Sequence, residues 1–491
     1  MTQIKMRYPV LGAAVLFASA CNNLDVTNPN QPDIQRALSS PADVQNLATS
    51  SLNSFYLTTV YPDPTLFGCV TSDVCTMNYG NFGARFNNLQ PRIPLANSTA
   101  NNDREVTENP WYGNYGTIGA ANDVLSVLKL GLSLSTPDLT QQYKEVAQFS
   151  QAASYTYLSM QFDKAFVVTE NTDKSVKATL LDHTAVRDST MRMWDDLIAA
   201  SASHSFTYAV TDLPMPDGAL TSARLTRIAN TLAAMTLAYH PRIPGQAVDW
   251  ARVAAYANKG IGTGSAGAPF DWVIQDDRQK WYSYLAMYGE FGPSGSGWVR
   301  TDHRVINRMN PSVPVEYTGA DPGPGTSPDA RYTTDYKYET PPIGDASRGK
   351  YMQSLYWHKR YAFTNWNSPT YGMGNVPFIL AAESDLIRAE ALIRSGGSRQ
   401  TAADLINKTR VGRGNLPPAT AADGDAALLS DISYERDVEI TNTSGTTLYW
   451  RRAVTDQPLR AGTPCQLPIP AKELETLALP IYTFGGSNPC S

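Results

Sequence analysis

Apolar residues recur at intervals of three and four along most of the chain, which is the spacing of one face of an α-helix. The longest such pattern runs over 139–166 and places Val146, Phe149, Ala153 and Tyr157 on one face. The same spacing predicts helices over 40–56, 111–128, 186–203, 223–239, 249–259, 378–394 and 402–411. Several of these have similar lengths and short connections, as in tetratricopeptide repeats. We therefore expect a mainly α fold of tetratricopeptide-like helix pairs with little β structure.

Two long segments lack this periodicity. Residues 61–109 are rich in Asn, Pro and aromatic side chains, and residues 262–375 are dense in Gly, Pro and aromatics. Long irregular segments within a compact chain are usually functional or mobile. We expect the ligand-binding surface in these two regions.

The first residues have the layout of an export signal. Lys5 and Arg7 precede an apolar run over 10–20, which ends at Cys21 and is about half the length that spans a bilayer. The small residues before Cys21 resemble a lipobox, although Ala18 stands where Leu is usual. We expect a signal peptide over 1–20, lipid on Cys21, a polar tether over 21–36 and one helical domain over 37–491. An ordinary secretory signal with an incidental cysteine is the alternative.

Composition narrows the class of ligand. The formal net charge is −5, charged residues make up 17% of the chain, and no basic block occurs. Such a chain does not have the basic patches of a nucleic-acid-binding protein. The low charge and abundant Tyr, Asn, Thr and Ser suit neutral polar ligands.

Four further cysteines, Cys69, Cys75, Cys465 and Cys490, follow Cys21. An even number in an exported protein predicts disulfides. The pairs Cys69–Cys75 and Cys465–Cys490 are the simplest of three possible connectivities. Metal binding is the alternative, but the spacings are not those of zinc sites and no His pair accompanies them.

Sequence motifs of catalysis and cofactor binding are weak or absent. Residues 262–267 (GTGSAG) fit G-x-G-x-x-G, but a predicted helix precedes them where a phosphate site needs a strand. This stretch is therefore predicted to be a loop. The five histidines form no metal-binding motif, and no G-x-S-x-G elbow occurs. We expect no cofactor, no metal and no catalytic residue.

Aromatic residues give the clearest candidates for ligand contact. The middle irregular segment holds Trp272, Trp281, Tyr282, Tyr284 and Trp298 among many glycines. Flat rings suit the C–H faces of sugars, and Tyr and Trp add a hydrogen-bond donor. Within the first irregular segment the candidates are Tyr79, Arg85 and Asn87. The alternative for any one ring is that it fills the core beneath the loops.

Several stretches resemble motifs of the SusD/RagB-like nutrient-binding lipoproteins. They are residues 111–122, 148–158, 378–392 (FILAAESDLIRAEAL), 407–415 (NKTRVGRGN), 434–440 (YERDVEI), 448–452 (LYWRR) and 467–474 (LPIPAKEL). The chain departs from the family pattern at Gln148 and Gln151, where arginines are usual, and 448–452 lacks an acidic residue. For Glu383, Arg388, Glu390, Glu435 and Arg436 we favour structural ion pairs over ligand contact.

This resemblance implies a tetratricopeptide-containing fold decorated by irregular loops. It also implies an outer-membrane lipoprotein, facing the cell exterior, that captures a nutrient and delivers it to a SusC-like TonB-dependent transporter. We expect an oligosaccharide in preference to a peptide. The alternatives are a lipid-anchored glycosidase or peptidase of unusual sequence and a tetratricopeptide scaffold of the envelope.

Overall fold

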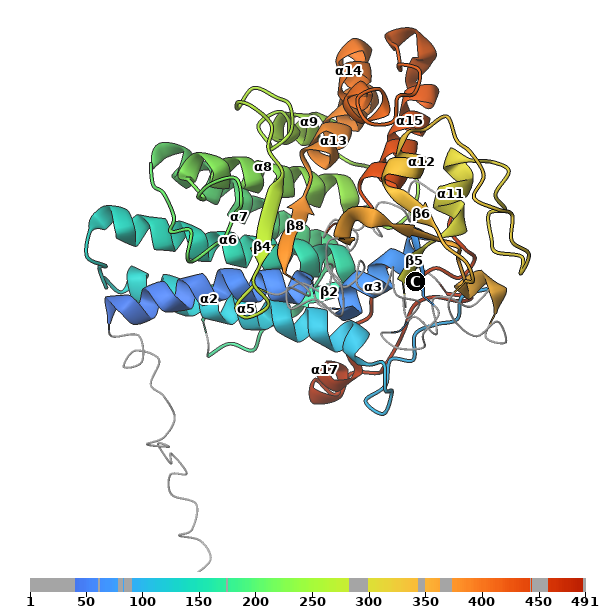
Figure 1. Cartoon of the computed structure of the whole chain (residues 1–491). Coiled ribbons are helices and arrows are strands. Elements are labelled where there is room, and N and C mark those ends of the chain that lie inside the picture. Colours follow the sequence, from blue (N-terminus) through green and yellow to red (C-terminus); the bar gives the residue numbers. More distant parts are fainter. Residues whose placement is uncertain are drawn as a thin grey trace, which may run out of the picture.

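The structure is a computed structural model that describes residues 40–488 apart from 61, 78–82, 84–90, 174, 282–298, 343–348, 363–372, 442 and 444–457. Helices dominate it (Figure 1). The helices are α2 (Pro41–Thr59), α3 (Pro62–Thr71), α5 (Glu105–Lys129), α6 (Pro137–Gln161), α7 (His183–Ser203), α8 (Ser222–Tyr239), α9 (Trp250–Ala257), α11 (His303–Met309), α12 (Arg331–Thr334), α13 (Ala381–Arg394), α14 (Arg399–Arg410), α15 (Gly424–Glu439) and α17 (Ala471–Thr476). The strands are β1 (Cys75–Met77), β2 (Lys164–Phe166), β3 (Leu180–Asp182), β4 (Trp272–Asp276), β5 (Val299–Thr301), β6 (Tyr336–Tyr338), β7 (Tyr356–His358) and β8 (Gly374–Ile379).

Side-chain caps fix where the long helices begin. The hydroxyl of Ser40 accepts a hydrogen bond from the Asp43 amide at 3.2 Å, and Pro41 occupies the first turn of α2. Thr136 caps α6 in the same way, with Pro137 after it, and Thr221 caps α8. These residues satisfy amides that a helix leaves without partners at its N-terminus.

The long helices form one continuous array. Helix α2 packs on α5, and the series continues from α5 through α6, α7, α8 and α9 to α13, which also contacts α14 and α15. Figure 1 shows this series rising from the blue helices to the orange ones. The predicted mainly α architecture of packed helix pairs is confirmed.

Both irregular segments leave and re-enter the array between helices that are neighbours in space. The first runs from the end of α2 to the start of α5, and the second from the end of α9 to the start of α13. Strands β4 and β8 pair antiparallel, with Trp272 opposite Ile379 and Asp276 opposite Gly374, and form a stem for the second segment. Insertions of this kind explain why the helical repeat is irregular along the sequence.

Some predicted boundaries were wrong. Helix α6 ends at Gln161 instead of 166, because Phe162 forms a bridge to Leu467 and β2 follows. Helix α13 begins at Ala381, since the apolar residues before it belong to β8. The first irregular segment contains α3 and β1, and the described part of the second contains β4 to β8 and the short helices α11 and α12. Short apolar runs do not distinguish a strand from a helix by their periodicity.

The segment 458–488 returns to the helices that lie near the start of the described chain. Leu467 pairs with Phe162, the Arg92 amide donates to the Ala461 carbonyl at 2.8 Å, and the Tyr482 hydroxyl donates to Asp163. We call 458–488 the return segment. Among the described residues, no helix is both long enough and apolar enough to cross a membrane.

Candidate functional site

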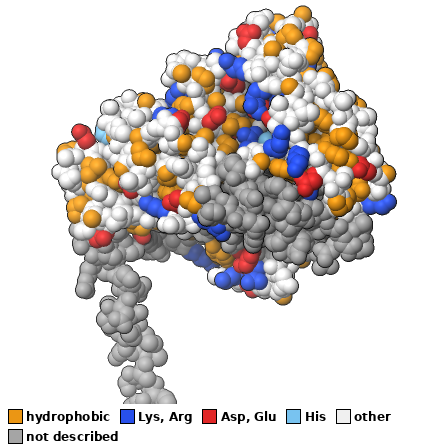
Figure 2. Space-filling model, viewed as in Figure 1, with side chains coloured by type: hydrophobic (Ala, Val, Ile, Leu, Met, Phe, Trp, Pro, Cys, Tyr) orange, Lys and Arg blue, Asp and Glu red, His pale blue; other side chains and the backbone are white. Residues whose placement is uncertain are grey.

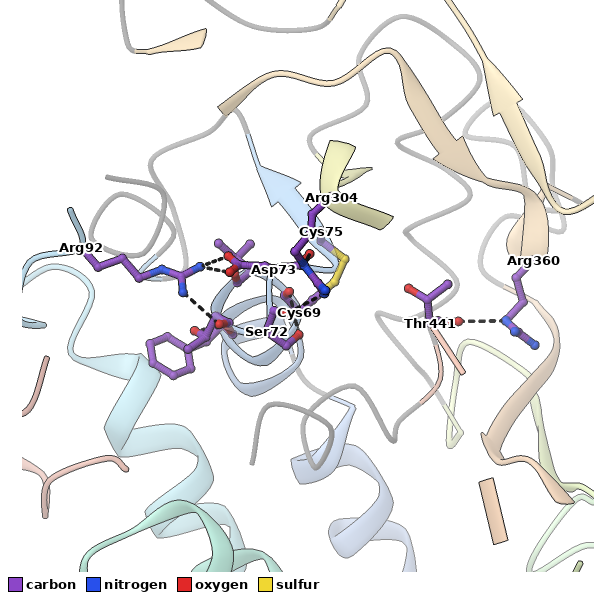
Figure 3. Close-up of a disulfide and its surroundings, with 11 residues drawn as sticks. Cys69, Ser72, Asp73, Cys75, Arg92, Arg304, Arg360 and Thr441 are labelled. Carbon is purple, nitrogen blue, oxygen red and sulfur yellow. Dashed lines mark hydrogen bonds and ion pairs between the residues drawn. A yellow bond between two sulfur atoms is a disulfide. The ribbon is translucent and has the colours of Figure 1, made fainter. Parts of the chain in front are cut away.

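The turn after α3 is closed by a disulfide between Cys69 and Cys75, whose Cα atoms are 5.2 Å apart (Figure 3). The predicted Cys69–Cys75 pairing is therefore confirmed. Cys465 is also disulfide-bonded. Its expected partner, Cys490, lies outside the described residues.

Strand β1 continues directly from this turn and pairs antiparallel with β5. Cys75 lies opposite Thr301, and Met77 lies opposite Val299. Met77 is the last residue before 78–82, and Val299 is the first residue after 282–298. The described ends of the two irregular segments therefore lie side by side, which joins the two regions that the sequence predicts for ligand binding.

A buried carboxylate holds the turn that precedes β1. Asp73 has a positive φ of 56° and accepts hydrogen bonds from Arg92 Nη2 at 2.7 Å, Arg460 Nη1 at 2.7 Å and the Arg460 amide at 3.0 Å. Burial opposes ionisation of this group, but Arg92, Arg460 and Arg304 outweigh it and lower the pKa of Asp73. The carboxylate is therefore ionised and binds Arg92 and Arg460, with the charge of Arg304 nearby.

Each of these arginines also fixes another part of the chain. Arg92 is 1% exposed and donates to the carbonyls of Val70 and Thr71 at the end of α3. Arg304 of α11 donates to the Asp73 carbonyl at 3.0 Å and pairs with Asp437 of α15 at 2.8 Å. Figure 3 shows Arg92 and Arg304 approaching the disulfide turn from different sides.

Arginines also hold the described residues next to 363–372 and 444–457. Arg360 donates to the carbonyls of Glu439 and Thr441 at 2.7 and 3.2 Å, which ties the residues before 363–372 to those before 444–457. Arg460, just after 444–457, also pairs with Asp302 at 2.9 Å. We call β1, β5, Asp73, Arg92, Arg304, Arg360 and Arg460 the loop frame. Its function is to fix where irregular segments leave the helical body.

Two of the predicted ligand-binding rings lie in the core. Trp272 is 2% and Trp281 is 1% exposed. The Trp272 ring packs edge-on against Phe378 at 4.6 Å between centroids, and the Trp281 ring lies 5.4 Å from that of Tyr56. As ligand contacts these two residues are corrected to core residues, since neither offers a ring face at the surface. In an irregular segment no periodicity indicates which ring points inward.

The other predicted site residues lie outside the described residues. They are Cys21, Tyr79, Arg85, Asn87, Tyr282, Tyr284 and Trp298. The signal peptide over 1–20 and the tether over 21–36 also lie outside them. These assignments stay predictions.

Three of the five motif residues of the C-terminal third, Glu390, Glu435 and Arg436, form buried ion pairs, as expected. Glu390 of α13 pairs with Arg436 of α15 at 2.8 Å and with Arg394 at 2.5 Å. Glu435 pairs with Arg331 at 2.7 Å. Glu435 and Arg436 lie near the end of α15.

Glu383 is a buried carboxyl on the same helix. Burial raises its pKa to about 7, although a hydrogen bond from the Tyr239 hydroxyl at 3.0 Å and the charge of Arg436 act in the opposite direction. Arg388, the remaining motif residue, donates to the Thr263 carbonyl at 2.6 Å. These contacts join α13 to α8 and to the loop after α9.

The G-x-G-x-x-G stretch forms a loop, as predicted. The Thr263 amide donates to the Asp385 carboxylate at 2.5 Å, and the Ser265 amide donates to the Asn258 carbonyl at 2.9 Å. These amides are already occupied within the protein, so the loop does not form a phosphate cradle. Burial raises the pKa of Asp385 to about 6, although the hydrogen bonds from Thr263 lower it.

The histidines are less scattered in space than in sequence. His183 Nδ1 lies 2.8 Å from His240 Nε2. Burial and the charge of Arg242 lower the pKa of His240 well below its usual range, so this pair is held without a positive charge on His240. Among the described residues, no three His, Cys, Asp or Glu side chains gather as metal ligands.

Arg92, Arg304, Arg360 and Arg460 were missed by sequence reasoning. An arginine in an irregular segment carries no local signal that it will bind a buried carboxylate or a carbonyl. Figure 2 shows Lys and Arg side chains next to the undescribed segments on the face in view. The described border of the site therefore contains basic groups as well as apolar ones.

Comparison with known proteins identifies the fold of the chain. No family model matches the sequence, and no curated protein matches it. A SusD-like carbohydrate-binding protein from Bacteroides fragilis is similar in structure, with a TM-score of 0.60, 17% identity, and 84% of this chain and 86% of that one covered. Surface glycan-binding protein A from Bacteroides uniformis gives 0.58 at 17% identity, covering 87% and 97%. A SusD homolog from Bacteroides thetaiotaomicron gives 0.62 at 14% identity, covering 91% and 97%. The chain has the SusD-like fold.

Proposed function

We propose that this protein is a surface lipoprotein that captures an oligosaccharide and delivers it to a SusC-like TonB-dependent transporter. The pairing of Met77 with Val299 carries this proposal, because it brings the described ends of the two irregular segments together. A ligand held between the two segments would then contact Tyr79, Arg85 and Asn87 from one and Tyr282, Tyr284 and Trp298 from the other.

The residue types at these positions favour a sugar ligand. Tyrosine and tryptophan rings stack on sugar C–H faces, while Asn and Arg side chains hydrogen-bond to hydroxyls. Of the three structural neighbours named above, two are described as carbohydrate- or glycan-binding proteins. These points support an oligosaccharide over a peptide as the ligand.

The mechanism is binding and transfer, with no bond broken. The ion pairs and the disulfide of the loop frame hold the segment ends in place before ligand arrives, which lowers the conformational entropy lost on binding. Lipid on Cys21 and the polar tether over 21–36 would keep the protein beside its transporter on the outer face of the outer membrane.

Calorimetric titration with a panel of neutral oligosaccharides and peptides tests the ligand class. We expect an oligosaccharide to bind, and Tyr79→Ala or Trp298→Ala to weaken its binding at least tenfold. Tyr112→Ala removes an exposed ring on α5, outside the loop frame, and should leave affinity unchanged. Peptide binding without oligosaccharide binding would overturn the ligand assignment, and so would equal affinity in all three variants.

Co-purification from membranes of the source cells tests the partner. A TonB-dependent transporter should accompany the wild-type protein in stoichiometric amount. Cys21→Ser should abolish retention on the cell surface while the purified body keeps its affinity for ligand. Recovery of the protein without any such transporter would contradict the delivery step.

A further inference from the structure

A pocket of about 520 Å³ lies in the helical body, and none of its lining residues belongs to the loop frame. It is formed by the last turn of α7, the first half of α8 and the loop after α9. His204, Asn230, Lys259 and Ala266 are among its lining residues. Its volume is within the range of small-molecule sites, roughly 300–1,000 Å³.

One arginine fixes the walls of this pocket relative to each other. Arg227 of α8 donates to the carbonyls of Gly260, Ala268, Ile261 and Gly262, at 2.9, 2.6, 3.1 and 3.2 Å. The loop is held from its other side by Asp385, which accepts from Thr263. The pocket is therefore preformed, and a ligand would not have to order its walls.

Several polar groups in the lining remain available to a ligand. Asn230 is only 1% exposed, and its Nδ2 donates to the Thr226 carbonyl at 2.8 Å. Within the described part of the chain, its Oδ1, the Lys259 ammonium and the Ser205 hydroxyl have no hydrogen-bond partner. An acceptor, a hydroxyl and a cation in one pocket match a ligand that carries both hydroxyls and a negative charge.

The Lys and Arg side chains of the lining give the pocket a positive charge. Arg227 and Lys259 are cationic, and the lining contains no Asp or Glu. The hydrogen bonds of Arg227 go to neutral carbonyls, so its charge is not neutralised by them. The first turn of α8, with Ser222 and Ala223 in the lining, adds the positive end of a helix dipole. The nearest carboxylate at His204 is Glu145, which is fully buried and not part of the lining.

We propose that this pocket binds one acidic sugar unit, a pyranose that carries a carboxylate. Lys259 pairs with the carboxylate, while Asn230 Oδ1 and Ser205 bind hydroxyls. This second site is separate from the loop frame and does not depend on the function proposed above.

Titration of the full mature protein with methyl β-D-glucuronide, methyl β-D-glucoside and sulfate tests the proposal by ligand-observed NMR. The glucuronide should bind at least tenfold more tightly than either of the others. Lys259→Gln should weaken glucuronide binding at least tenfold, because it removes the cation that pairs with the carboxylate. Asn230→Asp should weaken it as well, because it places a like charge in the pocket. Lys177→Gln, at an exposed lysine in the loop before β3, should have no effect.

Three outcomes would overturn the proposal. Equal binding of glucoside and glucuronide would show that the carboxylate is not recognised. Sulfate binding as tight as glucuronide would indicate an adventitious ion only. No loss of affinity in Lys259→Gln would place the ligand elsewhere. Tyr79→Ala and Trp298→Ala should leave glucuronide binding unchanged, so a failure here is distinct from a failure at the loop frame.

Discussion

Met77 and Val299 lie opposite each other in the antiparallel pair of β1 and β5, although one belongs to the first irregular segment and the other to the second. Each is the described residue next to a stretch that holds predicted ligand contacts. A displacement of either strand would therefore move both stretches together.

This pairing predicts coupling between the two sets of contacts. In a double-mutant cycle with Tyr79→Ala and Trp298→Ala, the two losses of oligosaccharide affinity should not add, since both residues act on one ligand through one strand pair. We expect a coupling free energy of about 1 kcal/mol, measured by calorimetry. Strict additivity would indicate two independent contact surfaces.

Asp73→Asn tests the carboxylate at the centre of the loop frame. Asn keeps the side-chain shape and tolerates the positive φ, so the change removes mainly the charge. Arg92 would then be buried without its carboxylate, and loss of one partner of a buried pair costs about 3–5 kcal/mol. Denaturant unfolding should show this loss in the free energy of unfolding.

Asp188→Asn is the matched surface control. Asp188 pairs with Arg187 at 2.7 Å, but its side chain is 54% exposed. Exposed ion pairs contribute about 0–1 kcal/mol, so the unfolding free energy should change little. If the two variants lost equal stability, Asp73 would not be the centre of a buried cluster.

The lowered pKa of Asp73 also sets the pH at which this contribution disappears. The ionised carboxylate stabilises the folded state fully above its usual pKa of 3.8, and the contribution is lost as pH falls through the lower folded value. Wild type and Asp73→Asn should therefore differ most at neutral pH, and the difference should shrink as pH falls below about 3.8. A constant difference down to pH 2 would contradict the lowered pKa.

Glu383→Gln tests a carboxyl whose pKa is raised, whereas the pKa of Asp73 is lowered. The folded pKa of Glu383 is about 7, against a usual value of 4.5. Between these values the folded state binds a proton that the unfolded state has lost, so stability falls as pH rises through this window. The Gln variant should lack this fall. Above pH 7 its free energy of unfolding should exceed that of the wild type by on the order of 3 kcal/mol.

Tyr239→Phe tests the raised pKa of Glu383 through its hydrogen-bond partner. Its hydroxyl donates to the Glu383 carboxylate and lowers the pKa of Glu383. Removal of the hydroxyl should extend the pH-dependent loss of stability to higher pH. Thermal unfolding across pH 4 to 9 would show both effects, and identical profiles in wild type and Glu383→Gln would refute the raised pKa.

Substitutions at Gly113 and Gly116 of α5 form a matched pair that tests how closely α5 packs against α2. A Cβ on Gly113 would lie 2.6 Å from Thr58 Oγ1 of α2, whereas a Cβ on Gly116 would meet no atom within 4 Å. Gly113→Ala should therefore force α2 and α5 apart and destabilise the protein by about 1–3 kcal/mol. Gly116→Ala should stabilise it by about 0.5–1 kcal/mol, because alanine favours the helix. Melting temperatures of the two variants would show the opposite signs.

The helical body could be predicted from the sequence because its signals are local. Ser40 and Pro41 mark the start of α2, and the three- and four-residue spacing around Val146 and Phe149 marks α6. The Cys69–Cys75 disulfide could be predicted from the short spacing of the two cysteines. Each of these features depends on residues that are close together in the sequence.

The site was predicted only by region, because its contacts join distant residues. Nothing in the sequence near Arg92 or Arg460 indicates that both will bind Asp73. Trp272 and Trp281 were assigned to ligand from their residue type, yet β4 and the Tyr56 ring place them in the core. Ring orientation is decided by packing, which short-range patterns do not contain.

The return segment makes the end of α6 depend on residues that lie far away along the sequence. Asp163 and Phe162, at the end of α6, complete their contacts only when Tyr482 and Leu467 are present. A chain that lacked 458–488 would leave these groups without their native partners. The end of α6 and the return segment should therefore lose their structure together on unfolding, although 319 residues separate Asp163 from Tyr482.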